Sequence, residues 1–351
     1  MRQAIQTALF ALFALLAGLA PAGQAAADDD VWRFAIEEIS GSVQDAYAQE
    51  FKRRIEEKSG GAVRIEIYPY GALGTSDDLT ELAAMGAIQF SNASPGHLGK
   101  LVPQIQVLSI PYLLSENDEV NKDVLQGSAV LYGEVGGELE KRGLKLLSVY
   151  PEGKMVWTTN RPVHTPEDFE NFKMRTMNSP MLISAYRAFG ASPTPLPYAE
   201  VYGGLQLKII DGQVNPVFAI EEMKFYEVSD YMIWAGQQTF TTTLITNSDW
   251  YWGLPAERRR WIDDTVKEMV DAIFDIARDY NYKRLEIIRK KAPGLEFIHL
   301  TPEERAVFKE RAKGLHRTFI DMAGPEGAAI LEGLQREIRD AEERLGAGPN
   351  G

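Results

Sequence analysis

Apolar residues along the chain recur at strand spacing and at helix spacing in turn. They alternate with polar residues over 32–38 and again over 63–67, as in strands with one buried face. Residues 43–59 and 77–85 instead carry apolar side chains at helical spacing. Strand, helix, strand and helix in this order predict an α/β lobe with a parallel or mixed sheet.

The middle of the chain repeats this pattern and predicts a second lobe. A buried strand over 144–150 leads into Pro151-Glu152-Gly153, where we place the first crossing between lobes, and the chain returns around 237–247. Further strands are predicted over 88–91, 155–160, 172–177 and 240–245. The expected divisions are 28–150 plus about 240–255 for lobe I, 151–239 for lobe II, and 292–345 for C-terminal helices packed on the lobes.

A long helix is predicted over 255–291, because this stretch has an apolar stripe and no internal proline or glycine after Pro255. About 36 residues rising 1.5 Å each would make a helix roughly 54 Å long. A single lobe has no need of such length, so we expect the helix to span both. The next helix is marked by Thr301 as N-cap, Pro302 behind it and Glu304 at the third helical position.

The N-terminal residues have the pattern of a secretory signal peptide. Arg2 precedes an apolar run over 8–19, and small residues follow up to Ala27. Twelve apolar residues are too few for the roughly 30 Å core of a bilayer. We expect cleavage near Ala27, removal of residues 1–27 and a periplasmic protein, without a lipid anchor because no cysteine follows the apolar run.

Composition excludes several classes of protein. The 351 residues contain no cysteine, so neither disulfides nor thiolate chemistry is available. The formal net charge of −13 disfavours nucleic acid and anionic lipid as partners. The length exceeds what one hydrophobic core usually serves, which again favours two lobes.

Sequence motifs give no support for a cofactor, a metal or a nucleophilic serine. The four histidines (97, 164, 299 and 316) have no metal-ligand spacing, and no glycine-rich nucleotide-binding string occurs. Ser94 superficially fits a nucleophile elbow, but a proline follows it where an oxyanion hole needs a backbone N–H. We therefore expect no cofactor, no metal and no enzymatic activity.

Residues 193–216, PTPLPYAEVYGGLQLKIIDGQVNP, form the most informative segment. Its first prolines fix φ and remove backbone donors, so it begins extended. A short helix is predicted next, with Val201, Leu205 and Ile209 on one face and Gly212 as its stop. An extended piece ending at Asn215-Pro216 follows; by itself this pattern is equally typical of a packing element.

The string itself resembles the signature of DctP-type substrate-binding proteins, the soluble receptors of TRAP (tripartite ATP-independent periplasmic) transporters. The resemblance implies an α/β, two-lobed periplasmic binding protein, type II-like, with a long lobe-spanning helix. It also implies a small-molecule ligand, TRAP membrane permease subunits as partners, and closure of the lobes about a hinge. We expect a monomer.

Arg175 is the first candidate for ligand binding. It lies in Lys173-Met174-Arg175, which resembles the strand whose arginine clamps the ligand carboxylate in that family. A guanidinium can meet a carboxylate through two parallel charge-assisted hydrogen bonds, which lysine cannot reproduce. The resemblance adds Asn215 as a second donor to the carboxylate.

Over the mature chain, the sequence resembles TRAP receptors for ectoine and 5-hydroxyectoine. The matches include 32–38, Ser94-Pro95-Gly96 and Pro151-Glu152-Gly153. In that family, the glutamate at position 38 meets the amidinium of the ligand. The expected site is therefore Arg175, Asn215, Glu38, Tyr70, Tyr198, His97, Phe218 and Asn92.

Departures from the family pattern concern the aromatic walls. Tyr70 and His97 stand where phenylalanine is usual, Tyr198 replaces a tryptophan, and Ala219 replaces a bulky ring. Each change makes the cavity roomier or more polar. A zwitterion is favoured because Glu38 is present, and a hydroxy, keto or sugar acid or a sulfonate is the alternative.

Two other functions remain open from the sequence. An exported hydrolase or lyase would need Glu37 and Glu38 as an acid–base pair, although adjacent strand residues point to opposite faces. A receptor that presents its ligand to a membrane sensor has the same sequence features as a transport receptor.

Overall fold

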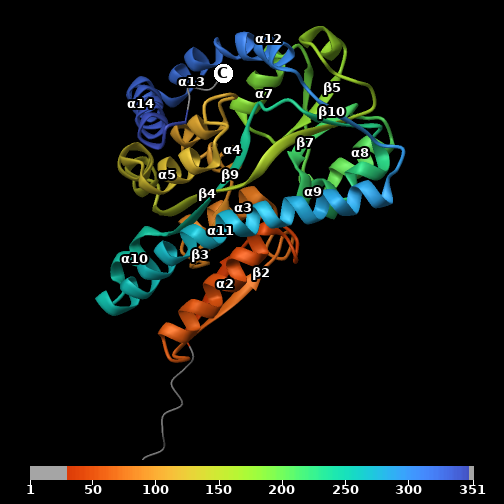
Figure 1. The fold of residues 1–351 in the computed structure, drawn as a ribbon. Helices are drawn as coiled ribbons and strands as arrows, with labels where there is room; N and C mark the ends of the chain where they lie inside the picture. The colour runs from red at the N-terminus through yellow and green to blue at the C-terminus, as the bar shows by residue number, and fades with distance from the viewer. Residues whose placement is uncertain (1–29, 348–351) are drawn as a thin grey trace, which may run out of the picture.

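The computed structural model describes residues 30–347, so the expected signal peptide over 1–27 lies outside the described residues. Within these described residues, ten strands and many helices confirm the α/β class. The molecule has two lobes, with a long helix running along both (Figure 1). Between residues 30 and 347, no helix is both long and apolar enough to cross a membrane.

The first sheet has the order β2 (Val63–Tyr68), β1 (Asp30–Ala35), β3 (Phe90–Ala93), β9 (Thr239–Asn247) and β4 (Leu144–Thr159). β1 is parallel to both of its neighbours, whereas β9 is antiparallel to β3 and to β4. The alternating apolar residues thus build a mixed sheet, as the sequence predicts.

The second sheet is built around the last residues of β4, which pair antiparallel with β7 (Gly212–Pro216) on one side and β8 (Tyr231–Trp234) on the other. β5 (Lys173–Thr176) lies parallel to β7, and β6 (Ser192–Pro195) lies parallel to β5. β10 (Glu296–His299) pairs in parallel with β8. Since β4 belongs to both sheets, it joins the two halves of the molecule.

β4 corrects one expectation from the sequence. Residues 151–153 were expected to break the chain into two strands, yet β4 runs unbroken over 144–159. Its pairing with β9 shifts register between Leu146 and Ser148 and between Pro151 and Gly153, and Gly153 has φ of 153°. These irregularities bend the strand without ending it. The residue boundaries expected for the lobes stay a prediction.

The long helix α11 spans Ala256–Lys291, 36 residues, and confirms the expected length. It packs on α2 (Val43–Lys58), on β4 and on α9 (Val217–Glu222), so it contacts elements of both sheets. Figure 1 shows α11 passing between the α2–β2 region and the α8–α9 region. Arg284 of this helix donates to the carbonyl oxygen of Gly41, at 3.1 Å, and to Glu222, at 3.2 Å.

Large aromatic side chains fill the core beside each sheet. Phe34, Phe51 and Phe90 pack together where α2 covers the first sheet. Trp157 of β4 meets Phe308 with ring centroids 5.3 Å apart, which fastens a C-terminal helix to the second sheet. This burial replaces the disulfides that a chain without cysteine cannot form.

The remaining helices cover the sheets and connect their strands. Their bounds are α3 Ser76–Ala84, α4 Pro95–Leu98, η1 Pro103–Ser109, α5 Asp118–Gly127, η2 Val130–Val135, α6 Gly136–Glu140, η3 Pro166–Phe169, α7 Pro180–Ala188, η4 Tyr198–Glu200, α8 Val201–Gln206, η5 Phe225–Val228, α10 Ser248–Gly253, α12 Pro302–Ala312, α13 Leu315–Ala323 and α14 Gly327–Leu345. α12 begins with the predicted capping box of Thr301 and Glu304.

The helix predicted before Gly212 ends earlier than expected. α8 stops at Gln206, and Lys208 adopts a left-handed conformation with φ of 57°. Ile209 is consequently 51% exposed and does not share the buried face of Val201 and Leu205. Gly212 instead begins β7, where an added Cβ would stand 2.8 Å from the carbonyl oxygen of Thr158. Close strand packing therefore explains this glycine.

Candidate ligand-binding site

A cleft lies where the carboxyl ends of parallel strands from both sheets meet. β1 and β3 of the first sheet lead into Glu37, Glu38 and Ser94, while β5 and β7 of the second sheet carry Arg175 and Asn215 near their ends. Ligands of open α/β sheets bind at such strand ends. The cleft is lined by Glu37, Glu38, Gln44, Ser76, Ser94, His97, Arg175, Met177, Tyr198, Asn215, Pro216, Phe218, Ala219 and Phe240.

Arg175 supplies a buried positive charge at one end of the cleft. Its side chain is held by the carbonyl oxygen of Leu196, which accepts from Nε at 3.0 Å and from Nη2 at 2.7 Å. Among residues 30–347, no carboxylate forms an ion pair with this guanidinium, although Arg175 is only 2% exposed. Burial lowers the pKa of Arg175 to about 10. Such a charge is costly unless an anion pairs with it.

The proline-rich segment explains how Arg175 is held in place. β6 runs parallel to β5 and ends at Pro195, so the chain at Leu196 is extended beside the arginine strand. Pro197 has no backbone N–H after that carbonyl, and the N–H of Leu196 itself donates to the carbonyl oxygen of Thr176 at 3.3 Å. Because Leu196 occupies the Nε side of the guanidinium, the hydrogens on Nη1 and the second hydrogen on Nη2 remain for a ligand.

Asn215 lies on β7, next to the arginine strand. Its Nδ2 donates to Oε1 of Gln213 at 2.5 Å, and Gln213 in turn donates to Oγ1 of Thr158 at 2.9 Å. This chain of hydrogen bonds fixes the amide while leaving it at the surface of the cleft.

Acidic side chains form the opposite end of the cleft. Glu38 accepts a hydrogen bond from the backbone N–H of Gln44, at 3.1 Å, and pairs with the side chain of Glu152. Gln44 Nε2 donates to Glu152 Oε1 at 2.8 Å. Burial raises the pKa of Glu38 to about 7, and burial together with the charge of Glu38 holds the pKa of Glu152 well above its usual range.

Glu37 corrects the argument that adjacent acids must point to opposite faces. β1 ends at Ala35, before the strand end expected from the sequence, so Glu37 and Glu38 lie in a bend and both line the cleft. Oε2 of Glu37 accepts from the backbone N–H of Ser94 at 2.8 Å, and Oε1 lies 3.0 Å from Nδ1 of His97. Both carboxylate oxygens of Glu37 therefore contact the Ser94–His97 turn and stabilise it.

Aromatic rings form the side walls. Tyr198 lines the cleft and meets Tyr70 edge-on, with centroids 5.8 Å apart. Tyr70 itself lines an adjoining groove that shares Ser76, His97 and Tyr198 with the cleft. Phe218 is fully buried at the wall, and its backbone N–H donates to Oδ1 of Asn281 on α11 at 3.2 Å.

Asn92 is the one expected site residue that the structure places outside both the cleft and the adjoining groove. It lies fully buried in β3, and its Nδ2 donates to the Tyr150 hydroxyl at 2.8 Å and to the carbonyl oxygen of Thr243 at 3.3 Å. Its hydrogen bonds tie β3 to β4 and β9. We therefore leave Asn92 out of the proposed site.

Sequence reasoning missed several residues of the cleft. Glu152 lies in a segment that was matched to the family, and Gln44 lies in the helix predicted over 43–59, but neither was assigned a role in the cleft. Met177 lies against Gly96, where an added Cβ would stand 2.5 Å from its Cε, so the glycine of Ser94-Pro95-Gly96 makes room for that side chain. Long-range pairs such as Gln44 with Glu152 leave no periodic signal in the sequence.

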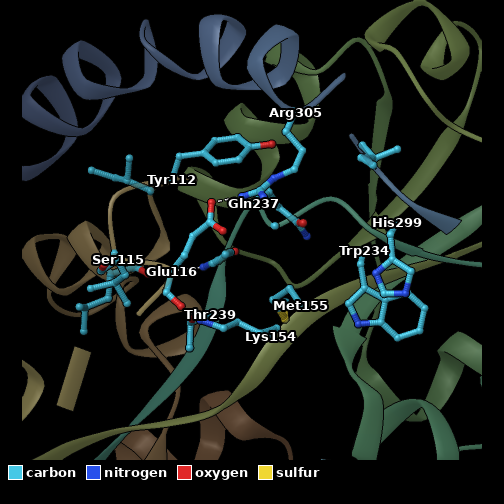
Figure 2. A pocket seen from close by; sticks show the side chains of 16 residues that line it. Tyr112, Ser115, Glu116, Lys154, Met155, Trp234, Gln237, Thr239, His299 and Arg305 are labelled. Carbon is cyan, nitrogen blue, oxygen red and sulfur yellow. Dashed lines mark hydrogen bonds and ion pairs between the residues drawn. The ribbon is translucent and has the colours of Figure 1, made fainter. Parts of the chain in front are cut away.

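A second cavity, which we call the back cavity, lies where the chain returns from β8 to β9 (Figure 2). Its volume is about 220 Å³, against about 40 Å³ for the cleft. Figure 2 shows Glu116 reaching Arg305, with which it forms an ion pair, and the stacked rings of Trp234 and His299, 4.7 Å apart. Its lining residues are Leu108, Ile110, Tyr112, Leu114, Ser115, Glu116, Lys154, Met155, Trp234, Gly236, Gln237, Gln238, Thr239, His299, Leu300 and Arg305.

These features define a class of protein. The two lobes are joined by the shared strand β4 and by the long helix α11, and the cleft between them presents a cation without an ion-pair partner and a carboxylate. This arrangement is typical of a solute-binding receptor. Residues 34–322 match the family described as bacterial extracellular solute-binding protein, family 7 (DctP). The chain belongs to this family.

Relatives with assigned ligands are similar over nearly the whole chain. The ectoine/5-hydroxyectoine-binding periplasmic protein UehA of Ruegeria pomeroyi is 40% identical over 92% of this chain and 94% of its own. The ectoine-binding periplasmic protein TeaA of Halomonas elongata is 40% identical over 90% of this chain and 92% of its own. The solved structure of the ectoine-binding protein of the TeaABC TRAP transporter superposes with a TM-score of 0.85, at 38% identity, over 89% of this chain and 100% of that one.

Proposed function

We propose that this chain is a TRAP-transporter receptor for ectoine or 5-hydroxyectoine, or a close zwitterionic analogue. The observation that carries the proposal is the buried, unpaired guanidinium of Arg175 facing a cleft whose other end holds Glu38. A ligand with a carboxylate at one end and a delocalised cation at the other satisfies both charges. The ligands named for UehA and TeaA support this choice.

Each cleft residue has a defined part in the proposed complex. Nη1 and Nη2 of Arg175 meet the ligand carboxylate end-on, because the Nε side is occupied by Leu196. Asn215 adds a donor to the same carboxylate, and Glu38 accepts from the N–H groups of the cation. Tyr198 and Phe218 pack against the ring, while Tyr70 and His97 border the groove that leads to it.

Hinge closure follows from the way the site is divided. Glu38 belongs to the first sheet's side and Arg175 to the second sheet's side, so a ligand that contacts both favours the closed arrangement over an open one. The bent strand β4, the return from β8 to β9 and the long helix α11 join the two sides.

The partners and location are part of the proposal. We infer that residues 1–27 direct export, that the receptor acts in the periplasm as a monomer, and that it delivers its ligand to the permease subunits of a TRAP transporter. The structure of TeaA, whose described complex is the TeaABC TRAP transporter, supports the permease partner.

A more polar organic acid is the second candidate, and the composition of the walls favours it. His97 is tied to Glu37 and Ser94 by contacts of 3.0 Å and presents a polar edge, and Ala219 leaves space where a ring is usual. A hydroxy, keto or sugar acid would use Arg175 and Asn215 while placing hydroxyl groups against these positions.

Calorimetric titration of the mature protein tests the two candidates. Ectoine and 5-hydroxyectoine are expected to bind with micromolar or tighter Kd, corresponding to about −8 kcal/mol or lower. Hydroxy acids and hexuronates of similar size are expected to bind far more weakly. Binding of the acids without binding of ectoine would contradict the zwitterion while leaving the receptor class in place, and product formed during incubation would contradict a purely binding role.

A further inference from the structure

Glu152 is a buried carboxyl group for which carboxylate binding offers no explanation. It lies in β4 with no exposed surface, in the segment joining the two sheets. Gln44 Nε2 donates to Oε1 at 2.8 Å, but Oε2 receives no hydrogen bond from any donor in residues 30–347. The group that Glu152 approaches is another carboxyl, that of Glu38. Two acids in contact can both be satisfied only if one of them carries a proton.

The surroundings of this pair are acidic from every side. Glu37 lies on the same loop as Glu38, Glu222 approaches from α9, and the hydroxyls of Tyr150 and Tyr198 approach from β4 and η4. Glu222 is paired with Arg284 at 3.2 Å, and the guanidinium of Arg175 stands at the other end of the cleft. In residues 30–347, no lysine or arginine forms an ion pair with Glu38 or Glu152.

We propose that Glu152 is a positioning residue that remains protonated and donates a hydrogen bond to Glu38, so that the receptor exchanges a second, more weakly held proton of this pair for the cationic end of its ligand. This inference rests on the proposed function, because it requires a ligand with a cationic group.

The proton balance follows from the two protonation states of the pair. In the empty cleft the pair holds one proton at high pH and two at low pH. A cation can be seated only when Glu38 is ionised, so binding to the doubly protonated form releases one proton from Glu38 to the buffer. Glu152 keeps its proton throughout and orients Glu38 toward the ligand.

The pH dependence of affinity then has a defined sign. The pKa of Glu38 is raised to about 7, so the binding-competent form grows as pH rises through neutrality. A carboxylate and an amidinium on the ligand keep their charges over this range. Affinity for ectoine should therefore be about tenfold higher at pH 8 than at pH 6, with about half a proton released per ligand at pH 7.

Titration calorimetry in buffers of different ionisation enthalpy, such as phosphate and Tris, measures this release directly. A number of released protons that decreases as the pH rises from 6 to 8 supports the proposal. Binding without proton release anywhere in this range overturns it. His97 also lies in the cleft, so the release must persist in H97Q.

Variants at position 152 separate positioning from simple packing. E152Q keeps a hydrogen-bond donor for Glu38 and an acceptor for Gln44, and it has the charge of a protonated glutamate. It should bind ectoine within threefold of wild type with unchanged proton release, whereas E152A should lose tenfold or more. If Glu152 were ionised instead, E152Q would change both affinity and proton release, and that result would overturn the assignment.

The ligand-free protein keeps this test separate from the identity of the ligand. A carboxyl group whose pKa is raised in the folded state stabilises the fold less as pH rises from its unfolded value near 4.5. The melting temperature of wild type should therefore fall relative to that of E152Q between pH 5 and pH 8. If the melting temperatures of wild type and E152Q change in parallel with pH, the assignment of a protonated Glu152 is overturned. If ectoine binds at no pH but the two melting curves diverge, the proposed function and the proton exchange on binding are both refuted. The proton shared by Glu38 and Glu152 would still stand.

Discussion

The cleft and the back cavity differ in how their charges are satisfied. In the back cavity, Arg305 is paired with Glu116, and Lys154 is paired with Asp118 at 2.9 Å. In the cleft, the only hydrogen-bond partner of the Arg175 side chain within residues 30–347 is the carbonyl oxygen of Leu196. The back cavity has a volume of about 220 Å³ against about 40 Å³ for the cleft, so size alone does not favour the proposed site.

What distinguishes the cleft is a pair of electrostatic costs that the protein alone does not offset. Burial disfavours the charge of Arg175 at one end and raises the pKa of Glu38 at the other. Among residues 30–347, the back cavity also contains buried atoms without a hydrogen-bond partner, in the amide of Gln237 and at Nε of Arg305, but the amide is neutral and the charge of Arg305 is paired with Glu116. An uncompensated charge points to a ligand of opposite charge more strongly than a neutral amide does.

Replacing Arg175 is the strongest way to break this contrast. R175A should reduce affinity for ectoine at least about 30-fold, because truncating one partner of a buried charged pair costs about 2–5 kcal/mol. R175K should recover little of this affinity. A lysine ammonium cannot donate two parallel hydrogen bonds to the ligand carboxylate and also donate to the carbonyl oxygen of Leu196 in the same geometry. Titration calorimetry gives both affinities.

R187A serves as the matched control, because Arg187 is exposed on α7. It should bind as wild type does, and all three variants should show the far-UV spectrum of the folded protein. Near-normal affinity in R175K would contradict the two-pronged clamp.

Replacing Glu38 sharpens the comparison at the other end of the cleft. E38Q should weaken ectoine by about 1.5–3 kcal/mol, the contribution of a hydrogen bond to a charged group, which is about 10- to 150-fold in Kd. The same change should leave a monocarboxylate unaffected or bind it more tightly, since a nearby negative charge is removed. Equal effects on both ligands would argue against a cation at Glu38.

The sequence predicts the side chains that line the cleft better than those that hold them in place. Arg175, Asn215 and Glu38 lie in short segments whose local pattern is distinctive, and all three line the cleft. Glu152 is matched by sequence but gains its role only from contact with Glu38 and with Gln44, 108 residues away. Asn92 shows the opposite case: its place in a matched loop suggests binding, yet its amide is used between strands.

The fold follows the same division. Alternation and helical spacing predict α2, β2 and α11 nearly to the residue, because each buries one continuous face. They do not predict that β4 continues through Pro151-Glu152-Gly153, because the pairing with β9 absorbs the irregularity by shifting register. Tertiary pairing overrides the local signal there.

Asn281 connects the long helix α11 to the cleft, and we expect its replacement to have an intermediate effect on stability and on ligand affinity. Its Nδ2 donates to the carbonyl oxygen of Glu152 at 2.7 Å, and its Oδ1 accepts from the backbone N–H of Phe218. N281A should lower the free energy of unfolding by about 1–3 kcal/mol, because buried backbone groups lose their partners. Denaturant unfolding measures this loss, and an unchanged midpoint with an unchanged slope would contradict it. Ligand affinity should fall less than in R175A.

Replacing Arg305 tests the other half of the comparison and has the smallest expected effect. Its ion pair with Glu116 is partly solvated, with side-chain exposures of 24% and 52%. Such pairs contribute about 0–1 kcal/mol, so R305Q should shift stability little. If the back cavity has no part in ligand recognition, ectoine should bind R305Q within about twofold of wild type, a difference of about 0.4 kcal/mol. A loss of tenfold or more at unchanged stability would mean that the return from β8 to β9 influences the closed state through this ion pair. The back cavity would then belong to the hinge, and the contrast between a charged cleft and a self-satisfied cavity would no longer separate the functional region from the rest of the molecule.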